Sequence, residues 1–249
     1  MAGHSKWAKV KHFKGKVDAA RSRAFSRCAK EISVAARVGG GDPNFNPRLR
    51  TAIAAARAEN MPNDNIDRAV RRGTGELEGV AYEESIYEGY APGGVAVVVE
   101  VLTDNKNRAA AEIRSIFTRH GGNLAAQGAV VYLFQRRGLV VVPRAQIGED
   151  DLMEIVLDAG AEDLRSDEDQ YEVITPVDAL DAVLEALRKE KVEPSSGRLA
   201  YLPQMQMPVN EDTAARKVLD LVEDLDGHDD VQHVYANFDI PEAILEKAC

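Results

Sequence analysis

The chain has 249 residues, of which 45% are hydrophobic and 29% are charged. This length and balance indicate one to three folded domains and exclude a wholly disordered chain. No apolar run approaches the roughly 18 residues that span a bilayer. The basic N-terminus has no apolar segment of the kind that a secretory signal carries, so we expect a cytoplasmic protein without a membrane partner.

The net charge of −10 conceals an uneven distribution. Residues 1–72 contain sixteen Lys and Arg against six Asp and Glu, whereas residues 73–249 contain fifteen against thirty-five. The N-terminal part therefore has a net charge of +10 and the remainder a net charge of −20. One end of the chain is suited to contact an anion, and the rest is suited to avoid one.

Residues 1–17 contain five lysines and no acidic residue, and we expect them to form a flexible basic arm. Trp7 and His12 place planar rings between the lysines, as stacking on unpaired bases would require. The alternative interpretations are that the charge run is a solvated surface and that Trp7 packs against the domain that follows.

Residues 18–78 show helical periodicity and predict a three-helix bundle. The first helix has an apolar arc on one side and a cationic arc on the opposite side. The segment from Gly39 to Pro43 ends this helix. The second helix, 47–60, begins at Pro47 after the capping residue Asn46, and the third covers 63–72. We predict nucleic-acid binding by the arm and by the cationic arc, through Lys6, Trp7, Lys9, Lys11, His12, Lys14, Lys16, Arg21, Arg23, Arg27, Lys30 and Arg37.

The rest of the chain predicts two α+β domains. Residues 137–204 alternate as strand, helix, strand, strand, helix, strand, which is the ferredoxin-like order. Two strands within 82–102, a helix over 105–120 and a strand over 129–134 precede them, and a helix and a strand follow. The predicted fold class is therefore α+β: a three-helix bundle followed by two ferredoxin-like domains, the last of which is inserted into the middle one. The middle domain comprises 79–136 plus 205–249.

Motifs for catalysis and for metal or cofactor binding are missing from the sequence. It contains no phosphate loop, no nucleophile elbow and no zinc-binding HExxH. His228 and His233 lie near three aspartates but without a metal-ligand spacing, so an acidic turn is the better interpretation. We therefore predict no catalytic residue, no metal and no cofactor.

Helices 47–60 and 63–72 are joined by a short turn, as in a helix–turn–helix. The second of them mixes Asp64 and Asp67 with its arginines, so the signal for duplex readout is weak.

Several strings of the sequence are similar to those of the YebC family. The opening Met1 to Trp7 carries the resemblance, as do Val34 to Pro43, Asn46 to Arg50, Asn60 to Pro62, Tyr87 to Gly94 and Leu102 to Arg108. The resemblance implies a bundle followed by two mixed domains in a cytoplasmic, non-enzymatic protein. Bacterial members are described as probable transcriptional regulators that bind DNA. Other members, related to the mitochondrial translational activator of cytochrome oxidase, resemble translation factors that relieve ribosomal stalling.

We expect a non-enzymatic, nucleic-acid-binding regulator, favoured as a monomer. The expected partner is DNA or ribosomal or transfer RNA, with the ribosome as a further partner. Structured RNA on the ribosome is preferred over DNA because a body of net charge −20 resists lying along a duplex. Two alternatives stay open: an enzyme with a site between the α+β domains, and a protein adaptor that uses the acidic domains.

Overall fold

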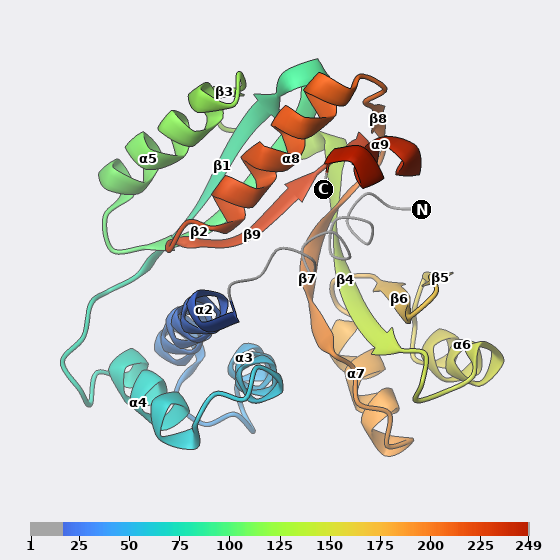
Figure 1. The fold of residues 1–249 in the computed structure, drawn as a ribbon. Coiled ribbons are helices and arrows are strands. Elements are labelled where there is room, and N and C mark those ends of the chain that lie inside the picture. The colour runs from blue at the N-terminus through green and yellow to red at the C-terminus, as the bar shows by residue number, and fades with distance from the viewer. Residues whose placement is uncertain (1–16, 249) are drawn as a thin grey trace.

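The computed structural model describes residues 17–248 and confirms the α+β fold class (Figure 1). A unit of three helices lies below a four-stranded sheet, and a second sheet lies beside both.

The helical unit consists of α2 (Val17–Gly39), α3 (Pro47–Ala58) and α4 (Asn63–Thr74). Apolar side chains from all three helices, Ile32, Leu49 and Ile66 among them, are buried together. At the start of α3 the Asn46 side chain accepts a hydrogen bond from the Leu49 amide, and Pro47 occupies the first helical position. The predicted helices 47–60 and 63–72 therefore end within two residues of the observed ones.

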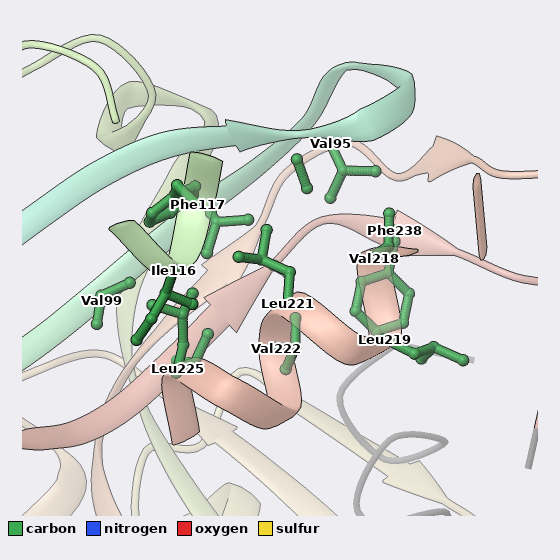
Figure 2. Close-up of a cluster of buried hydrophobic side chains, with 14 of the residues drawn as sticks. Val95, Val99, Ile116, Phe117, Val218, Leu219, Leu221, Val222, Leu225 and Phe238 are labelled. Carbon is green, nitrogen blue, oxygen red and sulfur yellow. The ribbon is translucent and has the colours of Figure 1, made fainter. Parts of the chain in front are cut away.

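The middle sheet contains β1 (Glu83–Ala91), β2 (Val95–Thr103), β3 (Asn123–Leu124) and β9 (Val231–Ala236), in the order β3-β1-β2-β9. All neighbouring strands are antiparallel. Helices α5 (Lys106–Arg119) and α8 (Asp212–Asp226) pack on one face, where Val99, Phe117 and Leu221 meet (Figure 2). The C-terminal β9 thus completes a sheet that begins with residue 83.

The short elements at the C-terminal side complete this unit. Strand β8 (Met207–Pro208) pairs in parallel with β10 (Phe238–Asp239), and α9 (Glu242–Ala248) lies against α8.

The second sheet contains β4 (Phe134–Pro143), β5 (Asp163–Ser166), β6 (Gln170–Thr175) and β7 (Ser196–Pro203). Its order, β5-β6-β4-β7, is antiparallel throughout and is the ferredoxin-like arrangement. Helices α6 (Glu149–Asp158) and α7 (Leu180–Lys189) cover one face. The middle sheet has the same layering of two helices on four strands, but its strand order differs.

The free faces of the two sheets pack on each other through an apolar cluster that includes Val98, Phe134, Leu139 and Tyr235. Strand β2 is therefore covered on both faces, by helices on one side and by the second sheet on the other. This arrangement explains the nearly continuous valine run of β2, because a strand with two buried faces needs no polar alternation.

The predicted strand over 129–134 is wrong. The structure has a turn followed by a 3₁₀ helix, η2 (Val131–Leu133), and β4 starts at Phe134. The amides of Gly128, Val130 and Val131 donate to the carboxylate of buried Glu88 at 2.6–2.8 Å. These amides therefore bond a side chain instead of a neighbouring strand.

Candidate nucleic-acid interface

The cationic arc of α2 divides into free and occupied side chains. Arg21 and Arg23, in the first turns of the helix, are exposed and form no ion pair with another residue of the described chain, 17–248. Arg37, in the last turn, is also exposed and donates a hydrogen bond of 3.2 Å to the carbonyl of Tyr82. These three guanidinium groups can reach an external anion.

Lys30 is buried and already has partners. The residue is 8% exposed, and its Nζ lies 2.6 Å from Asp230 Oδ1 and 2.9 Å from the Asp229 carbonyl oxygen. The ammonium group also lies 5.4 Å from the centre of the Tyr82 ring. Lys30 therefore joins α2 to the turn before β9, and its charge is not available to a phosphate.

Arg27 has a similar position one turn earlier on α2. It pairs with Asp226 Oδ1 at 3.2 Å and also donates to the Asp226 carbonyl. The helical arc identified which face carries the charges, but the carboxylates that meet Arg27 and Lys30 lie about 200 residues further along the chain. Arg27 and Lys30 therefore hold α2 against the middle domain and are not free to bind nucleic acid.

The arm residues Lys6, Trp7, Lys9, Lys11, His12, Lys14 and Lys16 lie outside the described residues. The helix that follows them begins at Val17, and its first turns carry Arg21 and Arg23.

Asp230 is the centre of the contact between α2 and the middle domain. One carboxylate oxygen accepts from Lys30, and the other accepts from Thr103 and Arg108, both at 2.8 Å. Burial alone raises the pKa of this carboxyl, but the hydrogen bonds from Lys30, Arg108 and Thr103 outweigh burial and lower the pKa to about 2. Asp230 is therefore charged at any physiological pH.

A cleft of about 840 Å³ lies between α2, α5 and the turn after α8. Its α2 wall carries Ser22, Arg23 and Ser26, and its α5 wall carries Ser115 and Arg119. The acidic Asp104, Glu112, Asp229 and Asp230 also line it. Arg108 bonds Asp104 and Asp230, and the exposed Arg119 pairs with Asp224 at 3.1 Å. Hydroxyl and guanidinium donors on facing helices can bind phosphodiester oxygens.

Further cations of the bundle were missed by the residue list drawn from the sequence. The exposed or half-buried Arg50, Arg57, Arg68, Arg71 and Arg72 form no ion pair within the described chain. The charge of residues 1–72 includes these arginines, whereas the interface predicted from the sequence comprises only the arm and α2.

His228, weighed above as a metal ligand, is held by hydrogen bonds to its neighbours. His228 Nε2 bonds Glu112 at 2.9 Å, and its Nδ1 accepts from the Asp230 amide. Across residues 17–248 no group of three His, Cys, Asp or Glu side chains is arranged to hold a metal ion. Burial raises the pKa of the Cys28 thiol to about 11, which disfavours the reactive thiolate.

No helix within 17–248 combines the length and the apolar composition that crossing a membrane requires.

Taken with the charge distribution, this geometry defines a class of protein in which a cationic helical unit is joined to an acidic body of two packed sheets. The chain belongs to the TACO1/YebC family: the family's N-terminal domain matches residues 5–76, and its second and third domains match residues 82–238. The resemblance to the YebC family is thereby confirmed.

Relatives and a solved structure resemble the chain over nearly its whole length. A probable transcriptional regulatory protein of Syntrophobacter fumaroxidans is 51% identical and covers 99% of each chain. One of the same description from Treponema pallidum is 53% identical over 98% of this chain and 100% of its own. The crystal structure of a conserved hypothetical protein from Aquifex aeolicus has 48% identity and a TM-score of 0.86, covering 92% of this chain and 94% of that one.

Proposed function

We propose that this protein is a regulator of gene expression that binds nucleic acid and acts without catalysis. The observation that carries this proposal is the separation of charge. The helical unit presents arginines without carboxylate partners in the described chain, such as Arg21 and Arg23, whereas residues 73–249 have a net charge of −20. The relatives' description as probable transcriptional regulatory proteins supports the regulatory role.

The interface of this proposal consists of the arm, the first turns of α2 and the adjoining cleft. The arm's lysines lead directly into Arg21 and Arg23, and Arg23 lines the cleft together with Ser22 and Ser26. A strand of nucleic acid held by the arm would therefore meet hydroxyl and guanidinium donors where α2 faces α5.

Within this function we favour RNA, structured as on the ribosome, over duplex DNA. A long duplex would bring many phosphates near the acidic sheets, and the repulsion would oppose binding. Unpaired RNA can enter a cleft and leave the body in solvent. Gel shifts with duplex DNA and co-sedimentation with ribosomes, both at physiological salt, test this preference. We expect co-sedimentation, and nanomolar sequence-dependent duplex binding without ribosome association would overturn the choice of RNA.

Replacing Lys6, Lys9, Lys11 and Lys14 by Ala tests the role of the arm. Each phosphate contact that is lost reduces the slope of log affinity against log salt by about 0.7–0.9, so the slope should fall by about three. The affinity is measured by fluorescence anisotropy over a range of salt concentrations. A matched variant replaces four exposed cations of the acidic body, Arg188, Lys189, Arg216 and Lys217, and should leave the slope unchanged. Equal slopes for the wild type and the arm variant would show that the arm makes no phosphate contact.

A further inference from the structure

The loop between α2 and α3 presents an aromatic side chain to solvent. Phe45 is 85% exposed, and Val38 at the end of α2 is 76% exposed. Phenylalanine has a flat apolar face and no polar group, so an exposed ring at this position is available to stack on a planar ligand.

The loop is held in this conformation by the residue next to Phe45. Asn46 is 4% exposed, and its side-chain amide donates to the carbonyls of Ala35 and Gly40, both at 2.8 Å. Its side-chain oxygen accepts from the Leu49 amide at 3.0 Å. All these bonds tie the loop to the helices on either side, so the ring is exposed because the backbone is fixed that way.

One arginine of α3 contacts the loop that carries the ring, and one aspartate lies in that loop. Arg50 donates to the Pro43 carbonyl at 3.3 Å, which places its guanidinium beside the loop, and it forms no ion pair within residues 17–248. The acidic side chain of the loop, Asp42, already accepts two hydrogen bonds of 2.9 Å from Asn44. Arg50 therefore keeps donors that are available to an external anion.

We propose that Phe45 stacks on an unpaired base of a single-stranded nucleic acid while Arg50 contacts a neighbouring phosphate. This inference rests on the proposed function and adds a contact point beyond the arm and the cleft. Proteins hold unpaired bases by stacking them on exposed aromatic rings and contacting the backbone phosphates with nearby cations. A protein partner would require about 800 Å² on this side, with several apolar residues at its centre, whereas the loop offers Phe45 and Val38.

Three substitutions of Phe45 test the stacking in the full chain, with a labelled single-stranded RNA of about 12 nucleotides as the probe. Phe45→Ala should weaken binding about 5- to 100-fold and leave the salt slope unchanged, because a stacked base is lost and no phosphate contact is lost. Phe45→Leu should weaken binding nearly as much, since leucine is apolar but has no ring. Phe45→Trp should retain the wild-type affinity.

Arg50→Gln tests the phosphate contact, and it should lower the salt slope by about 0.7. An unchanged slope would overturn the assignment of Arg50.

The controls separate this inference from the proposed function. Tyr132→Ala removes another exposed ring, 65% exposed and located in η2, and should leave the affinity unchanged. Melting temperatures of all the Phe45 variants should equal the wild-type value because the ring is largely in solvent. If the wild type binds and Phe45→Ala binds equally well, stacking is refuted and the proposed function stands. Full affinity of Phe45→Leu would refute stacking in favour of an apolar pocket. Failure of the wild type to bind any RNA or DNA, single-stranded, structured or duplex, would refute the proposed function itself.

Discussion

Asp230 fixes the position of the bundle through one buried carboxylate. It is 5% exposed, and its two oxygens are shared among Lys30 of α2, Thr103 at the end of β2 and Arg108 of α5. A buried carboxylate is stable only when it is paired and hydrogen-bonded in this way, and the loss of one partner leaves an uncompensated charge. The contact between α2 and the middle domain therefore depends on the ionised form of this residue.

Asp230→Asn should lower the free energy of unfolding at about pH 7 by about 2 kcal/mol, because the variant loses the stabilisation of the charged carboxylate. This energy corresponds to the lowering of the Asp230 pKa from 3.8 to about 2 on folding. Because the pKa in the folded state is below its ordinary value, this stabilisation is complete above about pH 5 and is lost progressively as the pH falls toward 2. Urea unfolding of the wild type and the variant between about pH 7 and pH 3 measures it.

The neighbouring Asp229→Asn is the control, since the Asp229 side chain is exposed and Lys30 bonds only its backbone carbonyl. A stability difference for Asp230→Asn that stays constant down to about pH 2.5 would contradict the role of the charge.

Helices α2 and α4 approach each other most closely where α4 has a glycine. A Cβ on Gly73 would lie 2.3 Å from the Ser33 carbonyl oxygen and 2.7 Å from the Ala36 side chain, both on α2. The Ser33 hydroxyl also donates to the Ala69 carbonyl at 2.9 Å, which satisfies a buried polar group at this crossing. A glycine is therefore required at position 73 because the two helices lie too close for a side chain, and not because the backbone adopts a special angle.

Gly73→Ala should destabilise the bundle by about 1–3 kcal/mol, because the added methyl group overlaps backbone atoms that cannot move independently. Thermal unfolding followed by circular dichroism measures the loss. Gly79→Ala is the matched variant, since its Cβ would meet only the flexible side chain of Arg72 at 3.2 Å. Equal melting temperatures for the two variants would show that α2 and α4 can separate without cost.

The three units of the molecule are joined by two different kinds of contact. The two sheets share an apolar cluster, and across it the Tyr235 hydroxyl bonds Glu100 and Arg198 at 2.8 and 2.7 Å. The bundle meets the middle domain through charged groups, including Arg27 with Asp226 and Arg48 with Glu84. The sheets should therefore move as one body, while the bundle is the unit that can be released.

The double substitution Arg27→Ala and Arg48→Ala tests this difference. We expect chymotrypsin to cleave after Tyr82, which contacts Lys30 and Arg37, several-fold faster than in the wild type, since each lost pair contributes roughly 0.2–1 kcal/mol. Cleavage within the two sheets should not change. Arg57→Ala with Arg68→Ala removes two bundle arginines that form no ion pair within 17–248, and this variant should behave as the wild type. Faster cleavage in both variants would indicate a general loss of bundle stability.

The sequence predicted elements better than it predicted contacts, and the reason is physical. Helix and strand periodicity depends on residues close in the chain, so the ferredoxin-like order and the bundle helices were recognised. The false strand over 129–134 and the partners of Lys30 depend on Glu88 and Asp230, which local patterns do not contain. The exposure of Phe45 likewise depends on Asn46 bonding to the end of α2.

The placement of β9 determines when each unit can be completed as the ribosome makes the chain. All three bundle helices have been synthesised by residue 74, and all four strands of the second sheet by residue 203. The middle sheet cannot be completed until α8 and then β9, which ends at residue 236, have been synthesised. Until then the valines of β2 lack the cover of α8 and the strand has an open edge, which favours aggregation. The nascent chain is therefore most prone to aggregate through the middle sheet, whose first strands are made before those of the second sheet.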